Sequence, residues 1–343
     1  MLADFYSNCI NSSIDAKFIE RFERIQCHIL PNHLSSNAVA AAIQSPIAPL
    51  SPVQRVDPVE IKQAIKPVQY KEFKDSFPFS VKMSLLETVH NLREKNILSN
   101  PSIQSKLMVS IVKTVMFDLY NQRLSKFFRQ PAVPQFARPL CAAAKALYTR
   151  HSLFTMMECN SILGRQDIDI IHGDKTGQLL RLAKFIVANA PSQSFNIQTP
   201  NQDPTSFLTN FDNLVKLFEM RDIKKSNELK QMIAKAGQHV FSNENQMIAA
   251  INENSNFAVK AAIAHMESSM LKETSNNQQN SVIRQIILLD SLVKIQDDLG
   301  WIVANHLISE EMAMELPFII SELIISLAPH TLILVDSFEV NRK

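Results

Sequence analysis

The residues best placed to do chemistry lie in one short run, residues 170–180, which also holds two of the chain's five glycines. His172 carries an imidazole, a side chain that can accept a proton near neutral pH. Asp174 and Thr176 follow in the first turn of a predicted helix, where they suit the positive end of the helix dipole. The run therefore predicts either a proton-transfer site or an ordinary loop that leads into a helix.

The other candidate residues give weaker patterns. Glu158 lies near the end of a predicted helix, where an acid at the edge of the core is a simpler interpretation than a catalyst. Cys27, His28 and His33 could form part of a metal site, but no further ligands follow at the spacing of a zinc centre. The four cysteines include no CxxC pair, which is typical of reduced thiols. No metal centre is predicted.

Composition favours a helical protein. Only five glycines occur in 343 residues, and a β-rich chain needs glycine for tight turns and bulges. Hydrophobic residues make up 46% of the chain, enough for sizeable cores. The 35 basic and 33 acidic residues nearly cancel, with a net charge of +2. That balance offers no electrostatic surface for nucleic acid.

Apolar periodicity and prolines predict three segments. Seven of the sixteen prolines fall between Pro31 and Pro78, which is typical of an extended connector. Pro191 and Pro200 mark a boundary between two helical regions, and Asp203 supplies an N-cap for the second. The predicted segments are a Pro-rich, partly extended arm over 1–75, a helical bundle over 76–190, and a second helical domain over 204–340. The predicted fold class is all-α, with two stacked helical bundles.

An apolar stripe over residues 103–119 recurs every four residues and is broad enough to contact at least two neighbouring helices. Such a stripe is core or an oligomer interface rather than the wall of a substrate tunnel. Its width suggests more apolar surface than one small bundle needs to bury, so we predict a dimer. Residues 323–335 form the longest uncharged apolar run near the C-terminus, but they are too few to span a bilayer. No secretory signal opens the chain. A soluble intracellular protein is expected.

Two blocks of sequence resemble the acyl-CoA oxidase family. In the first, Gly173, Asp174 and Thr176, followed by a Leu-rich helix that runs to Phe185, keep the frame of the family's segment Thr-Phe-Glu-Gly-Glu-Asn-Thr-Val. The run from Glu158 to Gly164 is similar to the family's turn Glu-Cys-Arg-x-x-Cys-Gly-Gly. In the second block, residues 289–308 and 327–338 are similar to the helical C-terminal domain that is specific to these oxidases.

The resemblance implies a reaction and a cofactor. Family members use FAD to convert an acyl-CoA to a trans-2-enoyl-CoA, with release of hydrogen peroxide, in peroxisomal fatty-acid β-oxidation. His172 stands where the family places the glutamate that removes the substrate's α-proton. The resemblance also implies that Gly173, Asp174 and Thr176 belong to an inherited cofactor-binding motif. It further implies pairing with a second copy or with an acyl-CoA oxidase, and a peroxisomal location, although the last three residues (341–343) are no peroxisomal tripeptide.

Departures from the family pattern leave the activity open. The family's enzymes are longer, and residues 1–100 have neither the length nor the strand alternation expected of the domains that hold much of the flavin. The leading interpretation is an acyl-CoA-oxidase-like protein of fatty-acid β-oxidation that is not independently catalytic. One alternative is a non-catalytic dimerisation or regulatory partner of a complete oxidase. Another is an incomplete oxidase chain.

Overall fold

The computed structural model describes residues 76–165, 176–189, 203–235, 243–275 and 280–338, together with residues 237 and 241. Every regular element in these ranges is helical, so the predicted all-α class is confirmed. The predicted Pro-rich arm over 1–75 lies outside the described residues.

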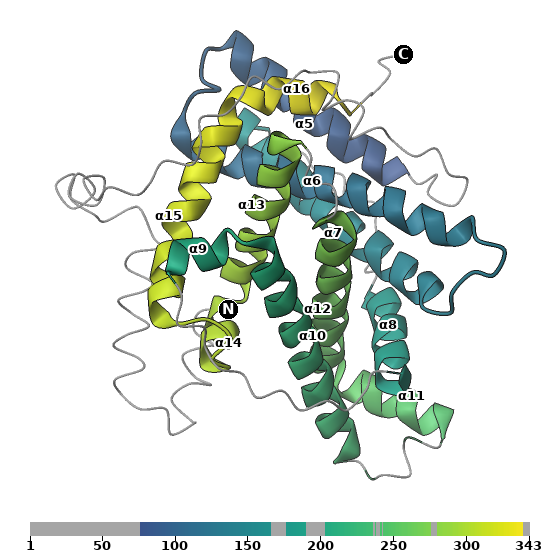
Figure 1. The fold of residues 1–343 in the computed structure, drawn as a ribbon. Coiled ribbons are helices and arrows are strands. Elements are labelled where there is room, and N and C mark those ends of the chain that lie inside the picture. Colours follow the sequence, from purple (N-terminus) through teal and green to yellow (C-terminus); the bar gives the residue numbers. More distant parts are fainter. Residues whose placement is uncertain are drawn as a thin grey trace. The chain divides into compact units, whose positions relative to one another are not determined.

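The helices, shown in Figure 1, are α5 (Ser76–Glu94), α6 (Pro101–Phe128), α7 (Ala137–Leu163), α8 (Thr176–Asn189), α9 (Pro204–Leu208), α10 (Phe211–Ala234), α11 (Glu244–Glu253), α12 (Ser255–Thr274), α13 (Ser281–Asp297), α14 (Leu299–Ala304), α15 (Glu310–Leu327) and α16 (Thr331–Asp336), with a 3-10 turn (Ala328–His330) before the last.

The α6 helix lies in the interior. It begins where the Asn100 side chain accepts hydrogen bonds from the next turn's backbone, and Pro101 occupies the first helical position, where its missing N–H costs nothing. From residue 107 to residue 120, only Val109 and Lys113 are not buried. The helix packs against α7, α12, α13 and α15. Of the two interpretations of this stripe, core or oligomer interface, the structure shows core, because neighbours from both helical regions cover it.

Two long stretches of helical sequence pattern within the predicted second helical domain, 204–236 and 244–273, are each interrupted at an asparagine. The pattern over 204–236 divides into α9 and α10 because Asn210 caps the second helix, accepting hydrogen bonds from the backbone of Asp212 at 2.9 Å and of Asn213 at 3.2 Å. The pattern over 244–273 divides into α11 and α12 at Asn254. Asparagine side chains compete with helical backbone bonds, so they favour helix ends over helix interiors.

A buried ionic network joins α10 to α12 and to the junction of α13 with α14. Arg221 donates to Asp298 Oδ2 at 2.7 Å and to Glu267 Oε2 at 2.6 Å. Lys225 Nζ lies 2.8 Å from the same Asp298 oxygen and 4.2 Å from the centre of the Trp301 ring. Both cationic side chains are buried. Such a network is stable only when every charge keeps its partner, so it fixes how these helices meet.

The C-terminal helices form the most apolar part of the described chain. Residues 310–336, which cover α15 and α16, are long and apolar enough to cross a membrane by length and composition alone. Half of the most apolar stretch is buried inside the protein. On the outer side of α15, Met314, Phe318 and Ile325 remain 52%, 46% and 70% exposed.

The two predicted helical regions pack closely together. The α8 helix, from the first region, contacts both α7 and α12, and α13 of the second region contacts α6. All of the described residues fall within one compact unit, Val53–Lys343. The proposed boundary between residues 190 and 204 stays a prediction.

Candidate functional site between the α8 and α11 helices

The residues that the sequence singled out lie mostly outside the described ranges. His172, Gly173 and Asp174 lie outside the described residues. Thr176, the last member of the motif, is the first residue of α8 and is half-buried there. The structure therefore leaves the predicted base and most of the predicted cofactor motif as predictions, while it describes the helix that follows them.

The α8 helix is amphipathic. Its buried face consists of Leu179, Leu182, Ala183, Ile186 and Val187. That face packs against α7 and α12, which holds the helix firmly from two sides. The remaining face of α8 contacts the shorter α11 helix, as Figure 1 shows.

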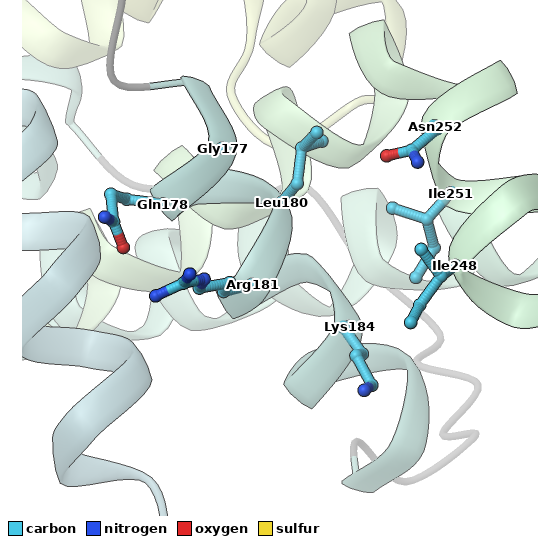
Figure 2. A pocket seen from close by; sticks show the side chains of 8 residues that line it. All are labelled: Gly177, Gln178, Leu180, Arg181, Lys184, Ile248, Ile251 and Asn252. Atoms are coloured by element: carbon cyan, nitrogen blue, oxygen red, sulfur yellow. The ribbon is translucent and has the colours of Figure 1, made fainter. Parts of the chain in front are cut away.

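A cavity of about 520 Å³ lies between α8 and α11 (Figure 2). Its apolar lining comes from Leu180 of α8 and from Ile248 and Ile251 of α11. Ile251 is buried, whereas Ile248 is 37% exposed, so the apolar wall is in part accessible to a ligand. A volume in the range of small-molecule sites and a partly apolar wall are properties of a binding cavity.

The polar lining is cationic. Lys184 forms an ion pair with Glu244, in the first turn of α11, and this pair connects the two helices. Arg181 is exposed and has no hydrogen bond or ion pair with any residue that the structure describes. The carbonyl oxygen of the Gln178 amide is buried and likewise has no hydrogen-bond partner in the described part of the chain. Among the described residues, the exposed polar lining therefore offers one guanidinium without a charged partner.

Sequence reasoning missed this cavity. The sequence does show Arg181 and Lys184 three residues apart, so they share one side of a helix. That signal alone does not distinguish a solvated helix face from a binding site. The wall that completes the cavity, with Asn252 at its end, comes from α11 about 70 positions later along the chain. Only the packing of the two helices brings them together.

Glu158 has a structural role. Its carboxylate accepts a hydrogen bond from the Ser110 hydroxyl at 2.9 Å and thereby connects α7 to α6. In the same interface His151 stacks on Phe117, with ring centres 5.7 Å apart, and its Nε2 lies 2.9 Å from the Thr114 hydroxyl. Because that hydroxyl already donates to the Ser110 carbonyl, it accepts from His151. In the described residues no three His, Cys, Asp or Glu side chains gather as a metal site.

Burial of His151 predicts a dependence of stability on pH. Desolvation, followed by the positive charge of Lys113, lowers the pKa of His151 to about 3. Between pH 6.5 and pH 3 the unfolded chain therefore binds a proton at this residue that the folded chain does not. The neutral His151 side chain therefore contributes fully to the free energy of unfolding above pH 6.5. As the pH falls from 6.5 toward 3, this contribution decreases by up to about 1.4 kcal/mol per pH unit. We expect the stability advantage of the native chain over His151→Gln to shrink across this range in urea titrations.

The control is His306→Gln, because His306 is exposed, whereas His90 pairs with Asp336 at 3.1 Å. The test compares the free energy of unfolding of the native chain with that of His151→Gln between pH 6.5 and pH 4. A difference that stays constant over this range would contradict the assignment of a neutral, buried imidazole.

Comparison with solved structures shows where this arrangement of helices recurs. Acyl-CoA oxidase 1 of Yarrowia lipolytica superposes with a TM-score of 0.63 at 14% identity, covering 83% of this chain and 50% of that one. Acyl-CoA oxidase 1 of Arabidopsis thaliana gives 0.60 at 15% identity, with coverages of 83% and 49%. Acyl-CoA oxidase-1 of Caenorhabditis elegans, solved with FAD and ATP, gives 0.62 at 12% identity, with coverages of 82% and 49%. The chain thus has the helical fold of these oxidases and spans about half their length.

The sequence agrees with the fold. Residues 210–341 match the family model for acyl-CoA oxidase, which covers α10 to α16. A comparison with curated protein sequences gave no significant match. The family model over residues 210–341 and the shared helical fold support an acyl-CoA oxidase C-terminal region, as the motifs predicted.

Proposed function

We propose that this chain is an acyl-CoA-oxidase-like protein of fatty-acid β-oxidation that does not turn over acyl-CoA by itself. The oxidase fold of the described helices supports the proposal, together with the sequence resemblance that sets His172 where the family has its glutamate. These 343 residues correspond to about half of each solved oxidase. Activity, substrate and location all belong to the proposal. A peroxisomal location is proposed through association with an oxidase.

The start of α8 at Thr176 supports a cofactor-binding role in this proposal, because the first turn of a helix is in general a favourable place for a phosphate. When bound, FAD supplies the acceptor for the hydride that leaves the substrate. The chain's own part would be to remove a proton at His172 Nδ1 or Nε2 and to hold the phosphate at α8. A histidine can accept a proton, but a base alone cannot complete a reaction that also needs a hydride acceptor.

The test is the purified 343-residue chain, compared with a complete acyl-CoA oxidase as the positive control. We expect no retained yellow flavin and no hydrogen peroxide from medium-chain or long-chain acyl-CoA. The variant His172→Glu restores the family's carboxylate and is expected to stay inactive, because it adds a base and no hydride acceptor. Stoichiometric flavin in the native chain, or peroxide formation by His172→Glu, would show that the chain is a working oxidase.

A non-catalytic partner role is the second proposal, and the exposed apolar side of α15 favours it. Met314, Phe318 and Ile325 lie on one side of that helix, with three- and four-residue multiples between them. The partner would be a second copy or a complete oxidase. Light scattering of the chain alone tests whether the partner is a second copy. A mass well above 38.8 kDa at micromolar concentration supports self-association, and a monomer excludes it.

A further inference from the structure

We propose that the outer side of α15 docks against the outer side of α7 in a second copy of this chain, as a head-to-tail contact between two different surfaces. The α15 face consists of the apolar residues Met314, Phe318 and Ile325, with Glu311, Glu315 and Glu322 along one edge. The α7 face consists of Arg150, Phe154, Met157 and Ser161. The inference rests on the partner role proposed above, and it names both the partner and the surfaces that meet.

Both faces have the spacing of helices that pack side by side. From residue 139 to residue 163, the exposed positions of α7 are 150, 154, 157 and 161. From residue 311 to residue 327, those of α15 are 311, 314, 318, 321 and 325. Alternating steps of three and four residues keep side chains in one row along a helix, which is the spacing of a helix-pairing seam. Each helix therefore buries its other sides within the chain and leaves one such row at the surface.

The exposed rows contain large apolar side chains. On α7, Phe154 is 59% exposed and Met157 is 41% exposed, one turn apart. They match the apolar residues of the α15 face in size and number. Large apolar side chains gathered on one surface favour a protein contact, because burial removes them from water.

Charge decides which faces pair. Residues 119–157 include six Lys and Arg and no Asp or Glu, whereas residues 299–338 include five Asp and Glu and no Lys or Arg. In the described part of the chain, neither Glu315 nor Glu322 forms an ion pair. Two α15 faces would bring acid against acid, and two α7 faces would bring Arg150 against Arg150, so like surfaces repel. An α15 face against an α7 face joins opposite charges, and a second copy supplies it.

Arg150 combines charge with an aromatic surface. Its guanidinium carbon lies 5.7 Å from the centre of the Phe154 ring, and no acidic residue that the structure describes pairs with it. A guanidinium stacked on a ring keeps its N–H edge free for a carboxylate. On α15, Phe318 and Glu322 are four residues apart and so present a ring beside a carboxylate. The two faces are thus complementary in both properties.

Sedimentation velocity of the full 343-residue chain tests the contact with two matched variants. Phe318→Ser disables the α15 face and Phe154→Ser disables the α7 face, and each is expected to weaken self-association by about tenfold or more. An equimolar mixture of the two variants is expected to form a complex of two chains, because each variant keeps the face that the other lacks. A mixture that stays at 38.8 kDa, or a Phe154→Ser chain that associates like the native chain, overturns the proposal.

The control is Phe257→Ser, because Phe257 is 39% exposed on α12 and outside both faces. This variant is expected to associate like the native chain, and a loss as large as that of Phe154→Ser would contradict the assignment of the faces. Unchanged thermal unfolding of each variant shows that it is folded.

Exchange of charges gives a second test. Arg150→Glu is expected to weaken association several-fold at low salt, because it sets acid against the acidic edge of α15. Adding Glu315→Lys and Glu322→Lys to that variant is expected to restore association, since both signs are then reversed, and no recovery would contradict the pairing. A native chain that stays monomeric, or that binds anionic lipid vesicles through α15 instead, overturns this pairing. The partner role itself is tested separately, by mixing the chain with a complete oxidase.

Discussion

Replacing Asp298 by asparagine is expected to lower the free energy of unfolding by about 3–5 kcal/mol, the range observed when one partner of a buried ion pair is removed. Asp298 is the anion that both Arg221 and Lys225 contact, at 2.7 Å and 2.8 Å. Asparagine keeps the shape and removes the charge. Arg221 then retains Glu267, but Lys225, whose side chain is 4% exposed, loses its carboxylate. Urea denaturation at neutral pH measures the loss.

The neighbouring residue provides the control. Asp297 differs from Asp298 in exposure rather than in chemistry: its side chain is 65% exposed and lies 3.4 Å from Lys113. Surface pairs of this kind contribute about 0–1 kcal/mol, so Asp297→Asn is expected to change stability little. Comparable losses for the two variants would mean that the network around Arg221 does not hold the helices together.

Truncating Ile111 to alanine in the middle of α6 is expected to cost about 2–5 kcal/mol, because the change opens a cavity in a closely packed interior. Ile111 is 0% exposed, and its helix contacts α7, α12, α13 and α15. The midpoint of thermal or urea unfolding should fall accordingly. This variant tests whether the stripe on α6 is core, as the structure has it, or an association surface, as its width suggested.

The matched variant is Ile325→Ala, with the same change of side chain on the exposed side of α15. Ile325 is 70% exposed, so truncation removes few contacts within the chain and is expected to shift stability by no more than about 0.5 kcal/mol. If Ile111→Ala were as mild as Ile325→Ala, the α6 helix would have to lie at a surface.

The sequence predicted the helices better than their limits and their partners. Periodic apolar residues identified α5, α6 and α8 because each buries a continuous side. The breaks at Asn210 and Asn254 were missed because asparagine also occurs within helices. At Asn210 the side chain caps the next helix, whereas at Asn254 it donates to the Ala250 carbonyl at the end of the preceding helix. The width of the α6 stripe indicated many contacts. It could not indicate that those contacts come from the same chain, since burial within a fold and burial in an interface leave the same pattern.

The candidate site was less predictable. The motif from His172 to Thr176 resembles a segment of the acyl-CoA oxidase family. Such a resemblance can be recognised from neighbouring residues alone, without knowing how the helices pack. The cavity depends on Arg181 and Asn252, which are far apart in the chain and meet only because α8 and α11 lie together. No local signal in the sequence encodes that meeting. The role of His172 therefore stays a prediction, while the cavity is a finding of the structure.

The interior position of α6 also constrains how this chain can vary. Between residues 107 and 120, only Val109 and Lys113 are not buried, so a change at almost any position must be accommodated by a neighbouring helix. Drift in sequence would have to proceed through paired or volume-conserving exchanges along this segment. Single substitutions can accumulate more freely on α11, where three of the ten residues are buried. One wall of the α8–α11 cavity can therefore diversify quickly while the helix at the centre of the fold stays nearly fixed.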